Sequence, residues 1–580
     1  MQVNKILIIS LLVAVFFDVK LVEAKPQLTA KDFSKEYNLR DAEISPDGSQ
    51  LAAIWIKNGM RIVVIKNLDN PKSKPVIAMK DAIFRPTSLV WANDNVLLIT
   101  LLVPEDTKRV VLRAKVKEDF NITDYDMSRR VVALNLKTGK SVELLGNMHR
   151  FKSNRNLSVI NNHLLKDPDH IIMQARIDDR YTLQKVNVNT GGTQDVVKSW
   201  YRTYDIITDD DGLPLYRLDH FYHANEIEVY EYQENKDWKH IETIEIDQTY
   251  QEMIENGELT SIFLGDSNRL IYRKRNDKTG YFEFVERDKL TGKNKVLVSV
   301  PNKDVEQLLV YGDGSELAGY TIQDDLIKFN FFDSDMQKQN DKISAQVGEF
   351  NFIYRSQRRS KPREIIYSYG MDNPGNYYIY DNKTEKLKHL SQRNFNLPTH
   401  KLAIPAQTQV TMRDGSKIRA YVLFPPTYQQ NKSAPMVVLP HGGPHVRDSA
   451  DWDLLAQCIA TRGYIVVKPN FRGSSGYGKA FEEAGYLQWG GLMQDDITDT
   501  VTEMIKQGYA NKDKICIVGA SYGGYAALMA TVKTPELFQC AVSINGVTDL
   551  IDMIDYDLGE AGRYQDIIEP LLFKRVGEPS

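Results

Sequence analysis

Cysteine is scarce in this sequence, which has three in 580 residues, at positions 458, 516 and 540. All three lie in apolar segments, such as KICIVG around Cys516. So few cysteines exclude a disulfide framework as the main source of stability, and their spacing fits no metal site. We therefore expect all three to be small residues of the hydrophobic core.

An excess of positive charge is also absent. The 73 Lys and Arg residues face 77 Asp and Glu residues, which gives a formal net charge of −4. Nucleic acid is therefore not expected as a partner, because phosphate binding requires a basic surface. The sequence presents no cofactor motif, so we expect neither a metal nor an organic cofactor. Whether the chain forms a homo-oligomer stays open.

Long apolar runs are missing beyond the N-terminus. The one that occurs extends from Ile6 to Phe17, after the basic Lys5 and before the small-residue pattern Val22-x-Ala24. This arrangement predicts a signal peptide over residues 1–24 and an exported chain, periplasmic or extracellular, with no membrane attachment after cleavage. The alternative is an uncleaved anchor, although the apolar run is short for a bilayer.

Helical periodicity is lacking between about Phe33 and Leu397. Short alternating strands are separated there by turns such as KTG and DNKT, as in RRVVALNLKTGKSVELL and NYYIYDNKTEKLKHLS. Repeats of this kind predict a β-propeller of about seven blades over residues 25–400. A pair of β-sandwiches is the alternative, but so many uninterrupted short strands exceed the usual sandwich.

The pattern changes near residue 400. Fully apolar strands such as PMVVLPHG and YIVVKPNFRG now alternate with helical segments, including the stretch from Phe481 to Tyr509, which we expect to be one long helical stretch. Alternation of this kind predicts a largely parallel sheet covered by helices on both faces. Residues 401–580 are therefore expected to form an α/β domain.

One serine stands at a position typical of a nucleophile. The segment Gly519-Ala520-Ser521-Tyr522-Gly523-Gly524 follows an apolar strand and opens an alanine-rich helix. Small flanking residues allow the sharp strand-to-helix turn that exposes a serine hydroxyl at the top of a sheet. The sequence LPHGGPH, Leu439 to His445, ends an earlier strand and can present a backbone amide to the same place, where a developing oxyanion needs two N–H donors.

Four motifs together resemble the prolyl oligopeptidase family: HGGPH, NFRGSSGYGKAF, QWGGLMQDD and GASYGGYAA. The similarity is greatest to its acylaminoacyl-peptidase and bacterial dipeptidyl-peptidase-like branch. It implies a β-propeller followed by an α/β-hydrolase domain, with peptides as substrates. It also implies that Ser521 is the nucleophile and that the amides of Gly443 and Tyr522 form the oxyanion hole. His441, Gly442, Asn470 and Arg472 would then belong to loops beside the substrate, and Trp489, Asp495 and Asp496 to a structural helix.

The histidine that this family places after the nucleophile is not found in the sequence. None of the ten histidines follows Ser521, and the acidic candidates Asp549, Asp552, Asp555 and Asp557 come one strand too early. We therefore expect a hydrolase domain without its last strands, in a fragment of a longer peptidase whose triad Asp and His are not on this chain. His441 or His445 acting as a substitute base is the less favoured alternative.

Three functions fit these residues. The favoured one is a serine peptidase that cleaves oligopeptides through an acyl-enzyme, because the serine turn and the glycine loop are both intact. A noncatalytic propeller protein and an esterase are the alternatives. The sequence leaves the specificity for the residue before the cleaved bond, and exo- against endo-cleavage, undetermined. Its one Glu-Glu pair, Glu482-Glu483, lies outside the propeller and disfavours an obligate dipeptidyl activity.

Overall fold

The computed structural model describes most of the chain from residue 28 to residue 579. The residues left undescribed are 1–27, 35–37, 71, 82–83, 105–126, 147–149, 152–153, 165, 179, 222–225, 246–261, 265–268, 289–290, 311–316, 349, 355–361, 395–396, 431, 562–564 and 580. The expected signal peptide at 1–24 lies outside the described residues. Within the described part, no helix is both long and apolar enough to cross a bilayer.

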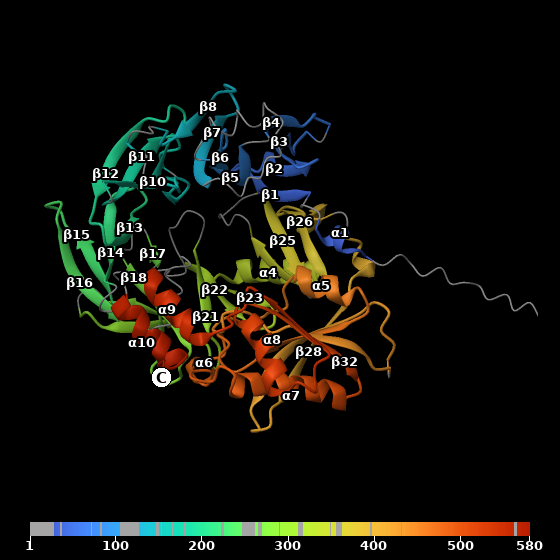
Figure 1. Cartoon of the computed structure of the whole chain (residues 1–580). Helices are drawn as coiled ribbons and strands as arrows, with labels where there is room; N and C mark the ends of the chain where they lie inside the picture. Colours follow the sequence, from blue (N-terminus) through green and yellow to red (C-terminus); the bar gives the residue numbers. More distant parts are fainter. Residues whose placement is uncertain are drawn as a thin grey trace, which may run out of the picture.

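Seven antiparallel sheets follow one another between Leu39 and Gln392, which confirms the expected propeller (Figure 1). Blades 1 and 2 consist of β1 (Leu39–Ile44), β2 (Gln50–Lys57), β3 (Met60–Asn67), β4 (Val76–Asp81), β5 (Arg85–Asn93), β6 (Val96–Pro104), β7 (Met127–Asn135) and β8 (Ser141–Leu144). Blades 3 and 4 consist of β9 (Ile160–Asn162), β10 (His170–Ile177), β11 (Arg180–Asn187), β12 (Thr193–Lys198), β13 (Thr203–Thr208), β14 (Pro214–Phe221), β15 (Glu226–Tyr232) and β16 (Trp238–Glu245).

The other three blades complete the ring. They consist of β17 (Ile262–Leu264), β18 (Arg269–Arg275), β19 (Phe282–Arg287), β20 (Asn294–Val298), β21 (Val305–Val310), β22 (Leu317–Gln323), β23 (Ile327–Phe331), β24 (Asn351–Tyr354), β25 (Arg363–Gly370), β26 (Asn373–Asp381) and β27 (Lys386–Gln392). Separate apolar clusters fill the spaces between successive blades, and one of them joins Leu39 and Ile44 of blade 1 to Ile365 and Tyr377 of blade 7. The ring therefore closes by side-chain packing between its first and last blades.

Blade 6 departs from the expectation that no helix interrupts the strands. It has three strands, and after β23 the chain forms helix α4 (Ser334–Val347). Asp333 caps this helix by accepting hydrogen bonds from two backbone amides, and Ile343 and Val347 are buried with the aromatic side chains of blades 6 and 7. The capping aspartate and the spacing of these two apolar residues are typical of a short amphipathic helix.

The α/β domain contains one six-stranded sheet in the order β28-β29-β31-β30-β32-β33. Its strands are β28 (Ile404–Thr411), β29 (Lys417–Phe424), β30 (Ala434–Val438), β31 (Ile465–Asn470), β32 (Ala510–Ala520) and β33 (Cys540–Ile544). The first two strands are antiparallel to their neighbours, and the last four run parallel. The sheet separates two apolar cores, one on each face. Ile465 and Val467 of β31 face one core, and Val466 faces the other.

The two faces of this sheet are covered by different helices. Their bounds are α5 (Leu454–Ala460), α6 (Lys479–Glu483), α7 (Leu492–Lys506), α8 (Tyr522–Lys533), α9 (Leu550–Ala561) and α10 (Gln565–Arg575), and a short helix α1 (Ala30–Phe33) precedes the propeller. Helices α7 and α8 pack on the face that Ile465 and Val467 line, and α5 packs on the opposite face. The long helical stretch expected from Phe481 to Tyr509 is wrong in extent. It is divided between α6 and α7, and the segment between them contains two left-handed residues, Leu487 at φ 59° and Gly490 at φ 67°.

The cysteine prediction is also wrong in part. Cys516 of β32 is paired in register with Cys540 of β33, and their sulfur atoms form a disulfide bond. The Cα atoms of the two residues are 4.7 Å apart, which lies within the range that a disulfide needs. Cys458 is free and packs, partly buried, against a small apolar cluster, which is close to the expected core position. The bond covalently ties the outermost strand of the sheet, among the described residues, to the strand that precedes Ser521.

The propeller and the α/β domain are joined by polar contacts from three neighbouring blades. The carbonyl oxygens of Gly280, Asp324 and Met371 accept hydrogen bonds from the Lys479 amide, from Arg447 and from Gln457 at 3.0, 2.8 and 2.7 Å. Arg275 of β18 and Glu482 of α6 form an ion pair of 2.6 Å in which both side chains are almost fully buried. The interface therefore hides charges and backbone groups that either part alone would expose.

We expect residues 401–580 to be poorly soluble when expressed without the propeller. Val542 and Ile544 on β33 are already exposed, and an apolar edge strand invites association. Loss of the propeller would also leave Glu482 without Arg275. Residues 25–400, in which the ring closes on itself, should remain soluble. Size-exclusion chromatography and thermal melts of both pieces measure this, and a monomeric, cooperatively melting 401–580 piece would contradict the expectation.

Candidate active site

Ser521 lies at the junction between β32 and α8, in an unusual backbone conformation. Its φ of 56° and ψ of −122° are rare for a residue with a side chain. The amide of Ser521 donates to the carbonyl oxygen of Ile544 at 3.1 Å, and its own carbonyl oxygen accepts from Tyr525 at 3.0 Å. The side chain is exposed at this turn. A strained serine between a buried strand and a helix N-terminus is the geometry of a nucleophile turn.

Glycines make this turn possible by removing side chains where backbones meet. A Cβ atom on Gly519 would lie 2.1 Å from the carbonyl oxygen of Gly523, and one on Gly523 would lie 2.2 Å from that of Pro440. A Cβ on Gly524 would lie 2.6 Å from the Cα of Gly546. All three distances are far shorter than a van der Waals contact. The start of α8 therefore touches both the loop after β30 and the loop after β33.

The loop after β30 passes directly beside the serine. A Cβ atom added to Gly442 would lie 4.0 Å from the Oγ of Ser521, and Gly443 takes a φ of 107° that favours glycine. Tyr522 is the first residue of α8, so its amide has no acceptor within the helix. The backbone of Gly443 and the amide of Tyr522 thus belong to two segments that meet at Ser521.

The side chain of Tyr522 points into the core. It is buried against Phe471, Trp489 and Tyr525, with ring centroids 5.2, 4.6 and 5.9 Å away. Burial raises the pKa of the Tyr522 hydroxyl well above its ordinary value, and this hydroxyl has no hydrogen-bond partner among the described residues. Trp489 lies just before α7, not on the helix as expected, and packs beneath the residue after the nucleophile. This aromatic cluster fixes the first turn of α8.

The two histidines of HGGPH are engaged away from Ser521. The Nδ1 of His441 donates to the carbonyl oxygen of Gly442 at 2.7 Å, its Nε2 lies 2.9 Å from the Oγ of Ser474, and its ring stacks on Phe471. The Nδ1 of His445 donates to the carbonyl oxygen of Gly473 at 3.0 Å. Among the described residues neither ring is hydrogen-bonded to Ser521, so the geometry does not favour either histidine as a substitute base.

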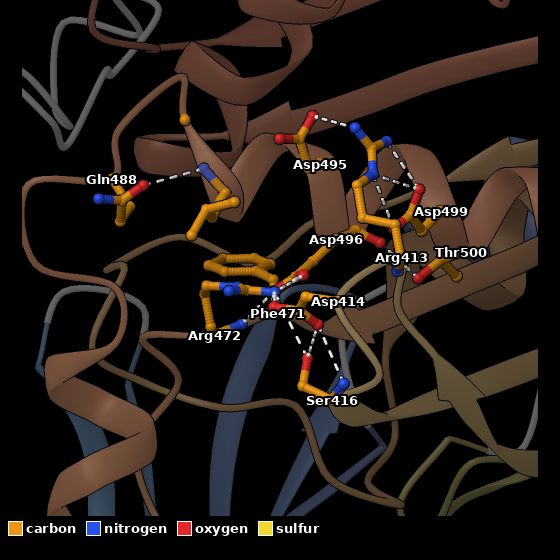
Figure 2. A network of polar contacts seen from close by, with 12 residues as sticks. Arg413, Asp414, Ser416, Phe471, Arg472, Gln488, Asp495, Asp496, Asp499 and Thr500 are labelled. Atoms are coloured by element: carbon orange, nitrogen blue, oxygen red, sulfur yellow. Dashed lines mark hydrogen bonds and ion pairs between the residues drawn. The ribbon is translucent and has the colours of Figure 1, made fainter.

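Asn470 and Arg472 hold the loop after β31. The side chain of Asn470 is fully buried, and it bonds to both backbone polar groups of Asp448 and to the hydroxyl of Tyr477. Arg472 donates from its Nε and a terminal nitrogen to the carboxylate of Asp496, at 2.8 and 2.7 Å (Figure 2). Both side chains are therefore occupied within the protein, and they act on the site by shaping its loops.

Figure 2 shows how Arg472 joins two acidic groups. It also bonds to Asp414 at 2.8 Å, and the pKa of Asp414 is lowered to about 2, first by the Ser416 hydroxyl and amide and then by Arg472. Asp496 is completely buried, and burial raises its pKa although hydrogen bonds from Arg472 oppose the shift. Asp495 and Asp499 of α7 bind Arg413 on the same side. The network ties α7 to the loop that contains Phe471.

The four acidic residues after β33 are placed around α9. Asp549 accepts backbone hydrogen bonds from Ile551 and Asp552 at 2.8 and 3.1 Å, so it caps the start of this helix. Asp552 and Asp555 are exposed on α9, whereas partial burial raises the pKa of Asp557. No described hydrogen bond links any of the four to a histidine. They therefore do not form the acid and base of a triad among the described residues.

We expect Gly523→Ala to destabilise the α/β domain by about 1 to 3 kcal/mol, because the new methyl group would overlap the Pro440 carbonyl. Gly559→Ala is the matched control, since a Cβ at Gly559 of α9 would meet nothing within 4 Å. That control should be neutral or stabilising by up to about 1 kcal/mol. Urea unfolding followed by tryptophan fluorescence compares the two variants, and an equal midpoint for both would contradict the close contact.

We also expect His445 to weaken the fold in mild acid. Burial, helped by the charge of Arg575, lowers the pKa of His445 from 6.5 to about 4. Between these two values the unfolded chain binds a proton that the folded chain does not, so the free energy of unfolding falls as pH drops from 6.5 to 4. The loss from this group reaches about 3 kcal/mol.

His445→Asn tests this expectation, because the Asn amide can still donate to the Gly473 carbonyl. The variant should be less stable than the parent at pH 7 but should lose less stability between pH 7 and pH 5. Urea unfolding at the two pH values gives both slopes. Parallel slopes would show that His445 does not carry the effect.

Comparison with known proteins places these features in one family. Residues 450–571, which include Ser521, match the model of the prolyl oligopeptidase family. Dipeptidyl aminopeptidase BIII of Pseudoxanthomonas mexicana is 36% identical over 209 residues, covering 35% of this chain and 30% of that protein. Dipeptidyl-peptidase 5 of Porphyromonas gingivalis is 32% identical over 139 residues, covering 24% of this chain and 20% of its own length. The matches thus span less than a third of either relative.

Solved structures resemble nearly the whole chain. A puromycin-hydrolysing peptidase of Mycobacterium tuberculosis has a TM-score of 0.62 at 15% identity, covering 95% of this chain and 83% of that one. An acylaminoacyl peptidase of Pyrococcus horikoshii has a TM-score of 0.61 at 15% identity, covering 93% and 83%. These likenesses support the fold, and the family match at residues 450–571 includes the nucleophile turn. Residues 450–571, with the nucleophile turn, are therefore similar to the prolyl oligopeptidase family, and the whole chain shares the fold of these solved structures.

Proposed function

We propose that Ser521 attacks peptide bonds of oligopeptides and forms an acyl-enzyme, as the nucleophile of a serine peptidase. The observation that carries this proposal is the backbone of Ser521, held at φ 56° between a buried strand and the first turn of α8. The strain leaves the hydroxyl exposed, and the helix N-terminus favours negative charge next to it. In this proposal the exposed hydroxyl is the atom that attacks the peptide carbonyl.

The amides of Gly443 and Tyr522 are the proposed donors to the tetrahedral oxyanion. Support comes from the approach of Gly442 to Ser521 and from the first amide of α8, which has no acceptor within the helix. Backbone donors of this kind do not need to reorganise as charge develops, and the loss of one such donor costs about 10² to 10³ in turnover. His441 supports the loop through its bonds to Gly442 and Ser474, while Asn470 and Arg472 support the loop after β31.

We further propose that the triad acid and base are contributed by polypeptide that this sequence does not contain. The support is that neither His441 nor His445 is hydrogen-bonded to Ser521 among the described residues, and that Asp549 caps α9. A serine hydroxyl needs a general base to attack, and the leaving amine needs a general acid. Without these groups turnover falls by about 10⁶, and only binding and the oxyanion donors remain.

We expect strong peptidase activity only after the chain is extended. The test fuses the C-terminal segment of the Pseudoxanthomonas enzyme to the chain after residue 579. It then compares the parent, the fused chain and the fused Ser521→Ala variant on a blocked chromogenic peptide. Labelling by a fluorophosphonate probe provides a second measurement. The fused chain should gain several orders of magnitude in rate and in labelling, and Ser521→Ala should lose both.

Two outcomes would refute parts of this proposal. Undiminished labelling of the Ser521→Ala variant would exclude Ser521 as the nucleophile. Rapid turnover by the parent chain, abolished by Ser521→Ala, would show that a residue of this sequence acts as the base. Cleavage of a matched ester but not of the peptide by the fused chain would favour an esterase. No labelling of any form would favour the noncatalytic alternative.

Export is part of the proposal. Residues 1–24 have the pattern of a signal peptide, and the disulfide between Cys516 and Cys540 fits an oxidising compartment. We expect the full-length gene product to leave the cytoplasm and to begin at Lys25. Cell fractionation followed by N-terminal sequencing tests this directly. Retention of Met1 on cytoplasmic protein would contradict export.

A further inference from the structure

Two large aromatic side chains are exposed side by side on the propeller. Trp200 and Tyr201 lie between β12 and β13, at exposed fractions of 53% and 54%. Their ring centroids are 6.1 Å apart with an interplanar angle of 26°, so the rings are stacked. The guanidinium of Arg202 lies 5.5 Å from the centroid of the Tyr201 ring, within cation–π range. We call Trp200 and Tyr201 the aromatic pair.

The turn that presents the aromatic pair is fixed from below. The amide of Thr203 donates to the carbonyl oxygen of Trp200 at 3.3 Å, and the amide of Ser199 donates to that of Tyr181 at 3.0 Å. The hydroxyl of Thr203 donates to the carboxylate of Asp219 at 2.6 Å and also contacts the hydroxyl of Ser199. Thr203 and Asp219 are fully buried, and Arg217 pairs with Asp219 at 2.9 Å.

Buried polar side chains beneath the aromatic pair hold its turn in one conformation before any ligand arrives. Binding of a ligand therefore does not require the turn to become ordered. Tyrosine and tryptophan offer a large contact area while losing few rotatable bonds. The aromatic pair therefore has the properties of a preformed contact for an apolar side chain.

Strand direction assigns the aromatic pair to the face of the ring that meets the α/β domain. Successive strands of a blade are antiparallel, so the turn between the second and third strands and the connection to the next blade emerge on one face. Gly280, Asp324 and Met371 all lie in turns between second and third strands, and all three bond to the α/β domain. Trp200 and Tyr201 lie in the connection from blade 3 to blade 4 (Figure 1).

The loop beside Ser521 reaches the same face of the propeller. The loop after β30 passes Ser521 at Gly442, and five residues later Arg447 donates to the carbonyl oxygen of Asp324 in the propeller at 2.8 Å. The loop beside Ser521 and the aromatic pair therefore both belong to the sides on which the two domains meet. An extended peptide of 12 residues spans up to about 40 Å.

We propose that the aromatic pair is a distal peptide-binding site, which holds an apolar or aromatic side chain of an oligopeptide whose scissile bond lies at Ser521. The proposal rests on the proposed function for its choice of ligand. It extends that function by assigning a second contact, remote from the bond that is cleaved. Long peptides are therefore bound by two separated sites, whereas short peptides reach Ser521 alone.

The test measures binding without cleavage, in the full chain carrying Ser521→Ala. Fluorescein-labelled peptides of 4 and 12 residues, with a Gly-Ser-Ala background and one Phe near the end distal to the scissile position, are titrated by fluorescence anisotropy. Trp200→Ala should weaken binding of the 12-residue peptide about tenfold, a typical loss for a buried aromatic contact. Trp200→Phe should lose less, and the 4-residue peptide should bind all forms equally.

Phe332→Ala is the matched control. Phe332 has an exposed fraction of 52% and follows the third strand of blade 6, at the end of that strand remote from Asp324, so it lies on the opposite face of the ring. This variant should bind the 12-residue peptide like the parent. A Kd that Trp200→Ala leaves unchanged, or that Phe332→Ala raises equally, would overturn the proposal. No binding of the 12-residue peptide by the parent would do the same.

Two further measurements separate the alternatives. Sedimentation velocity of the parent and of Trp200→Ala tests a second copy as the occupant. Self-association that disappears in Trp200→Ala, without a change in peptide affinity, would overturn the proposal in favour of a dimer contact. Fluorophosphonate labelling of the fused chain addresses Ser521 separately. Failed labelling with intact length-dependent binding would contradict the peptidase function and still support the aromatic pair.

Discussion

The contact between the first turn of α8 and the loop after β30 is the constraint on which the candidate site depends. At Gly523 the helix backbone lies so close to the Pro440 carbonyl that a methyl group has no room. This contact brings Gly442 beside Ser521 and sets the strained backbone of the serine. The aromatic packing of Tyr522 below the turn then holds the helix in place. Packing alone thereby brings together the serine hydroxyl, Gly442 and the first turn of α8.

The propeller completes this arrangement from the other side. The segment that passes Ser521 continues to Arg447, whose side chain lies over the ring of Tyr477 and bonds to the propeller at Asp324. Glu482, close to the loop held by Arg472, is neutralised by Arg275 of blade 5. Because these contacts bury charge, we expect docking of the two domains to stabilise the loops around the serine. The propeller thus contributes directly to the loops that surround the site.

The sequence predicted those features that depend on local patterns. Repeated strand-turn-strand units such as RRVVALNLKTGKSVELL indicated the propeller, and the glycines around Ser521 indicated the nucleophile turn. Features that depend on long-range register were missed. The disulfide of Cys516 and Cys540 requires that β32 and β33 be adjacent and in phase, which apolar surroundings alone do not reveal. The pair Arg275 and Glu482 similarly exists only after the domains dock. The helix α4 was a local error, because Asp333 and the spacing of Ile343 and Val347 were visible.

We propose that Ser521, Gly443 and Tyr522 surround one tetrahedral centre. The most direct measurement is a crystal structure of the fused chain treated with a peptide boronic acid, which forms a tetrahedral adduct with a nucleophilic serine. We expect a covalent bond from boron to the Oγ of Ser521. We also expect one boronate oxygen within about 2.7 to 3.1 Å of the amides of both Gly443 and Tyr522. A boronate bound to another residue, or bound to Ser521 with its oxygens directed away from both amides, would contradict the proposal.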